Sequence, residues 1–143
     1  MTTVAQVLKD KAYKEIYTIT PDATVLEAIS LMAEKSIGAL VVTHEGNVVG
    51  ILSERDYTRK IALMERTSFD TTVSEIMTGS VITVTTAATV EECLELMTDR
   101  HLRHLPVVED KQLSGLISIG DLVKAAMDDQ RKLIEQLQQY IPG

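Results

Sequence analysis

The chain has 143 residues, of which 45% are hydrophobic and 24% are charged, and its formal net charge is −7. This composition is typical of a globular protein that buries its own core. The negative charge argues against a nucleic acid as the main partner, because a phosphate backbone repels an acidic surface. It does not argue against a small nucleotide held in a locally basic pocket.

The apolar runs are too short for a helix that crosses a bilayer, so we expect no membrane partner. Residues 1–10 lack the basic region and apolar core of a secretory signal. Cys93 is the only cysteine, which excludes an internal disulfide and fits a reducing compartment. We therefore expect a cytoplasmic protein.

The first half of the chain predicts a helix, two strands and a second helix. Thr24 and Glu27 have the spacing of a helix capping box, and apolar residues follow at helical spacing. Strands are expected over residues 39–43 and 48–53, with a short turn between them. The second helix is expected to begin near Asp56.

The second half of the chain repeats this order. Asp56 and Asp121 lie 65 residues apart, and the same shift aligns the two halves without a gap from Thr18 to Asp56. Residues 3–8 also resemble residues 72–77, here with an offset of 69. We interpret the chain as an internal duplication.

The duplication predicts an α+β fold in which two similar units pack about a pseudo-two-fold axis. One unit of about 60 residues would bury too little surface alone, whereas two copies would share a core and leave two related clefts. We place the first repeat with its N-terminal segment at residues 1–66, the second repeat at 67–127 and a C-terminal helical extension at 128–143.

The motifs GILSERD at residues 50–56 and GLISIGD at residues 115–121 share a Ser-x-x-Asp spacing where a strand should meet a helix. One interpretation is structural, because this is the spacing of a capping box. The other is ligand binding, since a serine hydroxyl can donate to phosphate at a helix N-terminus and a carboxylate can accept from both ribose hydroxyls. The glycine that opens each motif would let another group approach the strand closely.

Arg55 distinguishes the two motifs. It stands beside Asp56 and would add a charge-assisted hydrogen bond to phosphate. Its counterpart is Gly120, which has no side chain. We therefore expect the two sites to bind unequally.

The order, doubling and spacing of these motifs resemble a stand-alone tandem pair of cystathionine-β-synthase (CBS) domains, also called a Bateman module. The resemblance covers residues 3–127 and rests on both Ser-x-x-Asp motifs, the helices EAISLM and ECLELM, and the segment HLRHLPVV. It implies two βαββα-like units and an adenine-nucleotide sensor with no catalysis of its own. The implied ligand is AMP, with ATP, ADP and NAD(H) as alternatives, and the regulated partner protein is unidentified.

The same resemblance implies the nucleotide-binding residues. Asp56 and Asp121 would bind ribose, and Ser53, Arg55 and Ser118 would lie near phosphate. Turns before the first strand of each unit would close the clefts, and a threonine before each first helix would line the base pocket. These further positions are Ile37, Gly38, Ala39, Leu102, Arg103, His104, Thr20 and Thr85.

Catalytic and metal-binding residues are not expected. His101 and His104 stand three residues apart, but no cysteine or carboxylate cluster completes a metal site. Cys93 aligns with Ala28 on the helix face expected to be buried, which favours a core thiol over a nucleophile. An enzyme that uses the nucleotide as its substrate is disfavoured, because the sequence offers no base–nucleophile pair.

The final helix is longer than its counterpart in the first repeat. Its apolar positions Val123, Met127, Ile134 and Leu137 need cover, either from the N-terminal segment or from a second chain. The resemblance to paired modules implies a homodimer. The alternative to nucleotide sensing is an interaction adaptor that regulates a partner protein without a bound nucleotide.

Overall fold

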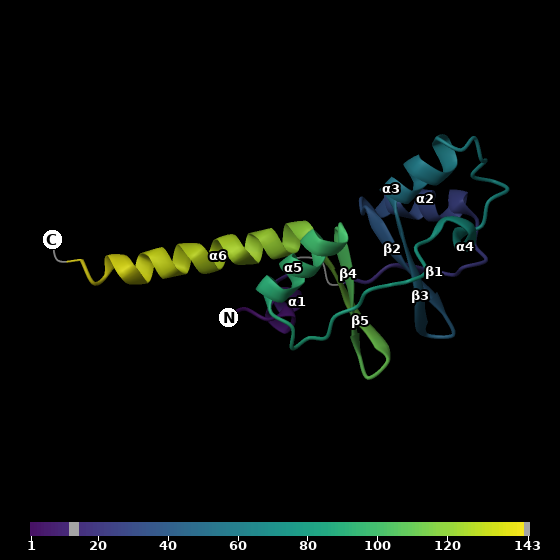
Figure 1. The fold of residues 1–143 in the computed structure, drawn as a ribbon. Helices are drawn as coiled ribbons and strands as arrows, with labels where there is room; N and C mark the ends of the chain where they lie inside the picture. Colours follow the sequence, from purple (N-terminus) through teal and green to yellow (C-terminus); the bar gives the residue numbers. More distant parts are fainter. Residues whose placement is uncertain (12–14, 142–143) are drawn as a thin grey trace. The chain divides into compact units, whose positions relative to one another are not determined.

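The computed structural model describes residues 1–11 and 15–141. Mixed helices and strands form two compact units, coloured along the chain in Figure 1. We name each unit after the aspartate of its motif. The Asp121 unit comprises Met1–Lys14, Thr83–Glu109 and Gly115–Gly143, and the Asp56 unit comprises Glu15–Ile82 and Asp110–Ser114.

The Asp56 unit contains a three-stranded sheet in the order β1-β2-β3. The first pair of strands is parallel and the second is antiparallel. Along the chain its elements are β1 (Thr18–Ile19), α2 (Val25–Lys35), β2 (Ala39–His44), β3 (Asn47–Ser53), α3 (Glu54–Tyr57), the π-helical turn η1 (Thr58–Ala62) and α4 (Val73–Ile76).

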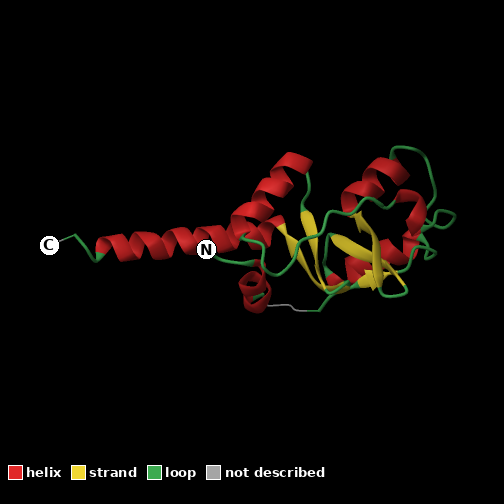
Figure 2. Ribbon diagram, turned by 60° about the horizontal axis from the view of Figure 1, so that its bottom comes forward, coloured by secondary structure: helices red, strands yellow, loops and turns green. Residues whose placement is uncertain are grey.

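The Asp121 unit has the same order with a shorter first strand and a longer last helix. Strands β4 and β5 pair with each other, and a single parallel bridge from Val84 to Val107 stands in place of β1. Figure 2 separates its helices and strands by colour. The elements are α1 (Val4–Asp10), α5 (Val90–Arg100), β4 (His104–Glu109), β5 (Gln112–Ser118) and α6 (Ile119–Gln138).

Both predicted capping residues begin their helices. The backbone N–H of Glu27 donates to Thr24 Oγ1 at 3.1 Å, and that of Glu92 donates to Thr89 Oγ1 at 3.1 Å. These bonds satisfy N–H groups that the first turn of a helix leaves free. The helix starts predicted from the repeated spacing are thus confirmed.

The two units bury equivalent positions. Ala28 of α2 and Cys93 of α5 are both fully buried, as are Leu40 of β2 and Leu105 of β4. Burial, with a smaller contribution from the Glu92 carboxylate, raises the pKa of the Cys93 thiol. Cys93 is therefore a protonated core residue, as its alignment with Ala28 predicts.

The short helices α1 and α4 are exchanged between the sequence repeats. The N–H of Val4 donates to the carbonyl of Ala88 at 2.8 Å, so α1 packs in the Asp121 unit. The equivalent bond in the Asp56 unit runs from Val73 of α4 to Ala23, also at 2.8 Å. The compact units therefore differ from the sequence division at residues 1–66 and 67–127, because these bonds tie each helix to the other repeat.

Helix α6 runs without a break through residue 128, where the sequence division places the start of an extension. Its first half packs on α1 and α5, and Leu122 is fully buried there. Every described residue from Gln130 onwards is exposed. Figures 1 and 2 both show this half leaving the body of its own unit. Among the described residues, no helix has the length and apolar character needed to cross a membrane.

Candidate functional site

The first Ser-x-x-Asp motif lies at the corner between β3 and α3. Ser53 is the N-cap: its N–H donates to Asp56 Oδ2 at 2.9 Å, and the N–H of Asp56 donates to Ser53 Oγ at 3.2 Å. The Ser53 hydroxyl also donates to Asp56 Oδ2 at 3.1 Å. The structural interpretation of the motif is therefore confirmed here, since both bonds of a capping box are present.

The second motif forms the same corner between β5 and α6. The N–H of Ser118 donates to Asp121 Oδ2 at 2.9 Å, and the N–H of Asp121 donates to Ser118 Oγ at 3.1 Å. In both corners the helix begins two residues before the aspartate, which is closer to the strand than the sequence pattern suggests.

Each corner is joined to the turn that the sequence associates with it. The N–H of Glu54 donates to the carbonyl of Gly38 at 3.0 Å, and the N–H of Ile119 donates to the carbonyl of Arg103 at 2.9 Å. Each bond holds a turn against its own corner, although the turn precedes the corner by about 15 residues in the chain. The turn residues beside them are Ile37, Ala39, Leu102 and His104.

Two lysines that the sequence analysis does not predict lie beside the corner aspartates. Lys60 Nζ lies 3.8 Å from Asp56 Oδ1 and donates to the carbonyl of Ile76 at 2.9 Å. Lys60 stands four residues after Asp56, and this spacing places both side chains on one face of a helix. The sequence alone could therefore have predicted this pair. Lys11 Nζ lies 3.0 Å from Asp121 Oδ2. No local spacing predicts that pair, because α1 reaches Asp121 only through tertiary packing.

The charges around the second corner shift two titrating groups. Burial raises the pKa of Asp121, but hydrogen bonds from Ser118 and the ion pair with Lys11 outweigh it, and the net pKa is lowered. Burial lowers the pKa of His104, Asp121 opposes that change, and Lys11 and Arg103 reinforce it. Asp121 is thus held ionised at neutral pH and His104 is held neutral.

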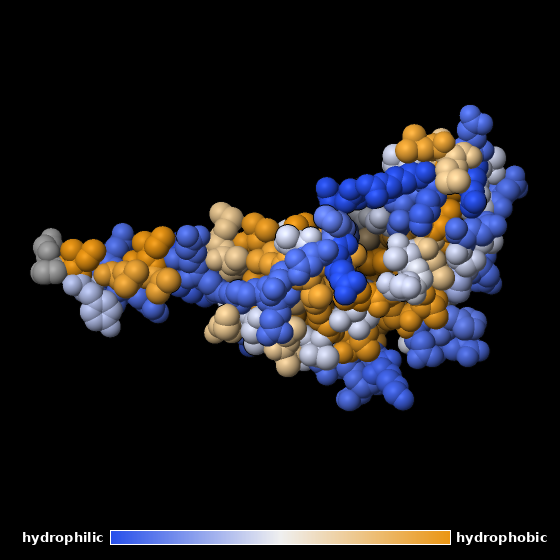
Figure 3. Space-filling view, viewed as in Figure 1, coloured by the Kyte–Doolittle hydropathy of each residue, from blue (hydrophilic) through white to orange (hydrophobic). Residues whose placement is uncertain are grey.

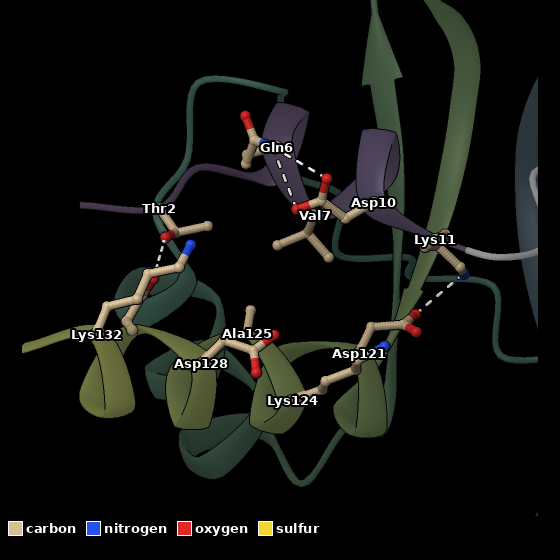
Figure 4. A pocket seen from close by; sticks show the side chains of 11 residues that line it. Thr2, Gln6, Val7, Asp10, Lys11, Asp121, Lys124, Ala125, Asp128 and Lys132 are labelled. Atoms are coloured by element: carbon tan, nitrogen blue, oxygen red, sulfur yellow. Dashed lines mark hydrogen bonds and ion pairs between the residues drawn. The ribbon is translucent and has the colours of Figure 1, made fainter. Parts of the chain in front are cut away.

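The Asp121 corner opens into a cavity of about 450 Å³ between α1 and α6. Figure 4 shows Lys11 and Asp121 at one end of it, and Thr2 and Lys132 at the other. The hydroxyl of Thr2 donates to Asp129 Oδ1 at 2.7 Å and ties the N-terminus to α6. The cavity carries both signs of charge, with lysine and aspartate side chains in its wall.

Other predicted site residues lie apart from these bonds. Arg55 is exposed in the first turn of α3, and Gly120 lies in the first turn of α6. Thr20 and Thr85 are exposed, and within residues 1–11 and 15–141 no hydrogen bond links either to a corner. Their predicted roles at phosphate and base remain predictions.

His101 has a structural role at the end of a helix. It ends α5 as a left-handed C-cap with φ of 56°, and Ser36 ends α2 in the same way with φ of 55°. In the described part of the chain, no three His, Cys, Asp or Glu side chains gather in the manner of a metal site.

The family model of the CBS domain matches residues 4–63 and 73–128. The chain belongs to the CBS domain family. Among curated relatives, the mitochondrial CBS domain-containing protein CBSX3 of Arabidopsis thaliana is 41% identical over 150 residues, which cover 99% of this chain and 73% of CBSX3. The match therefore spans most of the length of that relative.

Solved CBS proteins share the fold. A putative signal-transduction protein with CBS domains from Burkholderia ambifaria MC40-6 is 52% identical and superposes with a TM-score of 0.86, covering 90% of this chain and 96% of that one. This likeness confirms the predicted α+β fold with two CBS units.

Two more distant CBS structures share the fold and hold adenosine compounds. CBSX2 was crystallised in complex with AMP; it is 22% identical, with a TM-score of 0.75 and coverage of 90% and 98%. The CBS domain pair of MJ0100 was crystallised with 5′-methylthioadenosine and S-adenosyl-L-methionine; it is 24% identical, with a TM-score of 0.78 and the same coverage.

Proposed function

We propose that this CBS pair is a regulatory module that binds an adenosine ligand, with AMP as the first candidate, and has no catalysis of its own. Each Ser-x-x-Asp corner would hold one ligand. The aspartate would accept from the ribose hydroxyls, and the serine would donate to phosphate. ATP, ADP and NAD(H) carry the same adenosine portion and are the alternatives.

One observation carries the proposal: capping uses one oxygen of each corner carboxylate. All bonds to Asp121 run to Oδ2, and among the described residues no hydrogen bond reaches its Oδ1. In the same described part of the chain, Asp56 Oδ1 has only the longer contact of 3.8 Å with Lys60. A carboxylate oxygen has two lone pairs, so a ribose diol can be bound while the cap is kept.

The relatives support an adenosine ligand by analogy. CBSX2 binds AMP, and the MJ0100 pair binds two adenosine compounds that lack a phosphate group. The part common to these three ligands is the nucleoside. That common part favours the aspartates, which would bind ribose, as the central recognition groups.

A thermal-shift experiment tests the proposed function. AMP should raise the melting temperature, because a ligand that binds only the folded chain stabilises it by mass action. Inorganic phosphate at the same concentration should do so far less. Equal stabilisation by the two compounds would contradict the role given to the aspartates. No stabilisation by any adenosine compound would favour the alternative, an adaptor that regulates a partner without a nucleotide.

We also propose that the module is a homodimer. Helix α1 covers the face of α6 that carries Ala125 and Asp129, and it leaves Val123 and Met127 exposed. Ile134 and Leu137 continue that exposed apolar face, which Figure 3 shows as orange patches along α6. A second copy is the occupant that we propose, since an unpaired apolar helix face is poorly stable in water.

The curated relative CBSX3 is a mitochondrial protein. We propose a cytoplasmic location for this chain, because its single cysteine fits a reducing compartment.

A further inference from the structure

Lys11 reaches the second corner from a part of the chain outside the repeated motif. It follows the last residue of α1, and its side chain is 26% exposed. Its ammonium lies 3.0 Å from Asp121 Oδ2 and donates to the carbonyl of Leu116 at 2.8 Å. Leu116 and Asp121 stand on either side of Ser118, so the ammonium lies beside the corner itself.

The ammonium group of Lys11 has more donors than the two that the corner uses. It carries three N–H bonds, and two of them are directed to Leu116 and Asp121. Among residues 1–11 and 15–141 the third has no partner, and it can donate to a ligand that enters the corner. Because Lys11 also neutralises Asp121, it reduces the repulsion that a carboxylate would otherwise exert on a phosphate group.

Both corners hold their serine hydroxyl against the aspartate carboxylate. Ser53 donates its hydroxyl hydrogen to Asp56 Oδ2 at 3.1 Å. The Ser118 hydroxyl accepts from the N–H of Asp121 at 3.1 Å, and its own hydrogen bond to the Asp121 carboxylate helps to lower the pKa of that group. The charged donor that distinguishes the second corner is therefore the third N–H of Lys11.

The cavity gives a ligand access to Lys11 and Asp121. Lys11 and Asp121 line one end of it. Its other cations, Lys124 and Lys132, belong to α6, and its aspartates lie along α1 and α6. At the strand end of the corner, Arg103 and His104 add one cation and one neutral imidazole.

We propose that Lys11 is the phosphate-binding residue of the Asp121 corner and that it makes this corner selective for phosphorylated adenosine ligands. The inference rests on the proposed function and deepens it. Lys11 supplies the cation that Gly120 does not, and it does so from the exchanged helix α1 rather than from the motif. The hydroxyl of Ser118 would be the second donor to the same phosphate once its hydrogen rotates away from Asp121.

The Asp56 corner lacks this arrangement. Lys60 lies 3.8 Å from Asp56, whereas Lys11 lies 3.0 Å from Asp121. Arg55 is a further cation of that motif, and it is exposed. We therefore expect the Asp121 corner to discriminate AMP from adenosine more strongly than the Asp56 corner does.

Calorimetry on the full chain with AMP and with adenosine tests the proposal. The background is Asp56→Ala, which removes ribose binding at the other corner. Adding Lys11→Gln should weaken AMP by about tenfold to a hundredfold, the value of a charge-assisted bond, and leave adenosine unchanged. Lys132→Gln is the matched control, because it removes the same charge at the far end of the cavity, and it should change neither affinity.

The outcomes separate the two claims. If AMP and adenosine weaken equally in Lys11→Gln, the role of Lys11 is wrong while the proposed function stands. If the unmodified chain binds neither compound, both are wrong. If Lys11→Gln fails to fold, a crystal structure of the unmodified chain with AMP decides: Lys11 Nζ should lie within about 4 Å of a phosphate oxygen. A longer distance would overturn the proposal.

Discussion

The side chain of Leu8 fills the space that a Cβ atom on Gly115 would need. Leu8 Cδ2 lies 2.7 Å from that position. Met77 takes the equivalent place beside Gly50 in the Asp56 unit. The opening glycine of each motif thus admits a close neighbour, as the sequence predicts. That neighbour is a side chain from the exchanged helix segment.

Gly115→Ala should destabilise the protein by about 1–3 kcal/mol, the usual cost of overpacking. Urea denaturation measures this change in the free energy of unfolding. Gly79→Ala is the control, because a Cβ atom there meets no atom within 4 Å. In the double variant Leu8→Ala/Gly115→Ala, the two effects should be less than additive. Full additivity would show that the contact does not explain the glycine.

The corner aspartates can be tested one at a time by calorimetry with AMP. Asp56→Ala and Asp121→Ala should each remove one binding event and keep the other, with different affinities. The double variant should bind no AMP, because both ribose-binding carboxylates are then absent. Unchanged binding in the double variant would reject the whole site assignment and leave the motifs as helix caps.

Arg55→Ala tests the cation of the first motif. We expect it to weaken AMP more than adenosine, by about tenfold or more, because only AMP carries the phosphate that Arg55 would bind. The measurement is calorimetry on a chain that also carries Asp121→Ala. Arg59→Ala, an exposed charge in η1, serves as the control. If the affinities for AMP and adenosine fall equally, Arg55 does not bind the phosphate.

His104 should make the unliganded protein sensitive to mild acid. Burial keeps the pKa of His104 below the unfolded value, so protons bind the unfolded chain first. Its contribution to stability is present above about pH 6.5 and is lost as the pH falls through the lower folded-state pKa. His104→Gln should therefore lose less stability than the unmodified protein between neutral pH and about pH 5.

The control for the pH experiment is His44→Gln, since His44 has a side chain that is 62% exposed. Its thermal stability should follow that of the unmodified chain at every pH. If His104→Gln behaves in the same way as His44→Gln, the imidazole of His104 does not carry the pH dependence.

The exposed apolar face of α6 predicts how the module assembles. Light scattering should give about twice 15.8 kDa for the unmodified chain. Leu137→Glu should shift the mass toward that of a monomer, because it places a charge on the face left uncovered. Gln136→Glu adds the same charge off that face and should stay dimeric. A monomer across micromolar concentrations of the unmodified chain would contradict the homodimer.

The sequence by itself determined the repeat and the local structure that depends on neighbouring residues. The spacing of Thr24 to Glu27 and of Ser53 to Asp56 gives capping boxes, because these bonds close over three residues. The 65-residue shift also aligned Ala28 with Cys93, and both are buried. Such features follow from short-range geometry and from hydrophobic periodicity, which a single sequence contains.

Only the tertiary structure decided which groups meet across long separations. It exchanged α1 and α4 between the repeats, through backbone bonds such as that from Val4 to Ala88. It also brought Lys11 to Asp121, a pair 110 residues apart in the chain. No sequence pattern encodes that contact, because an ion pair needs only opposite charges at one point in space, and the packing of α1 against β5 and α6 creates that point.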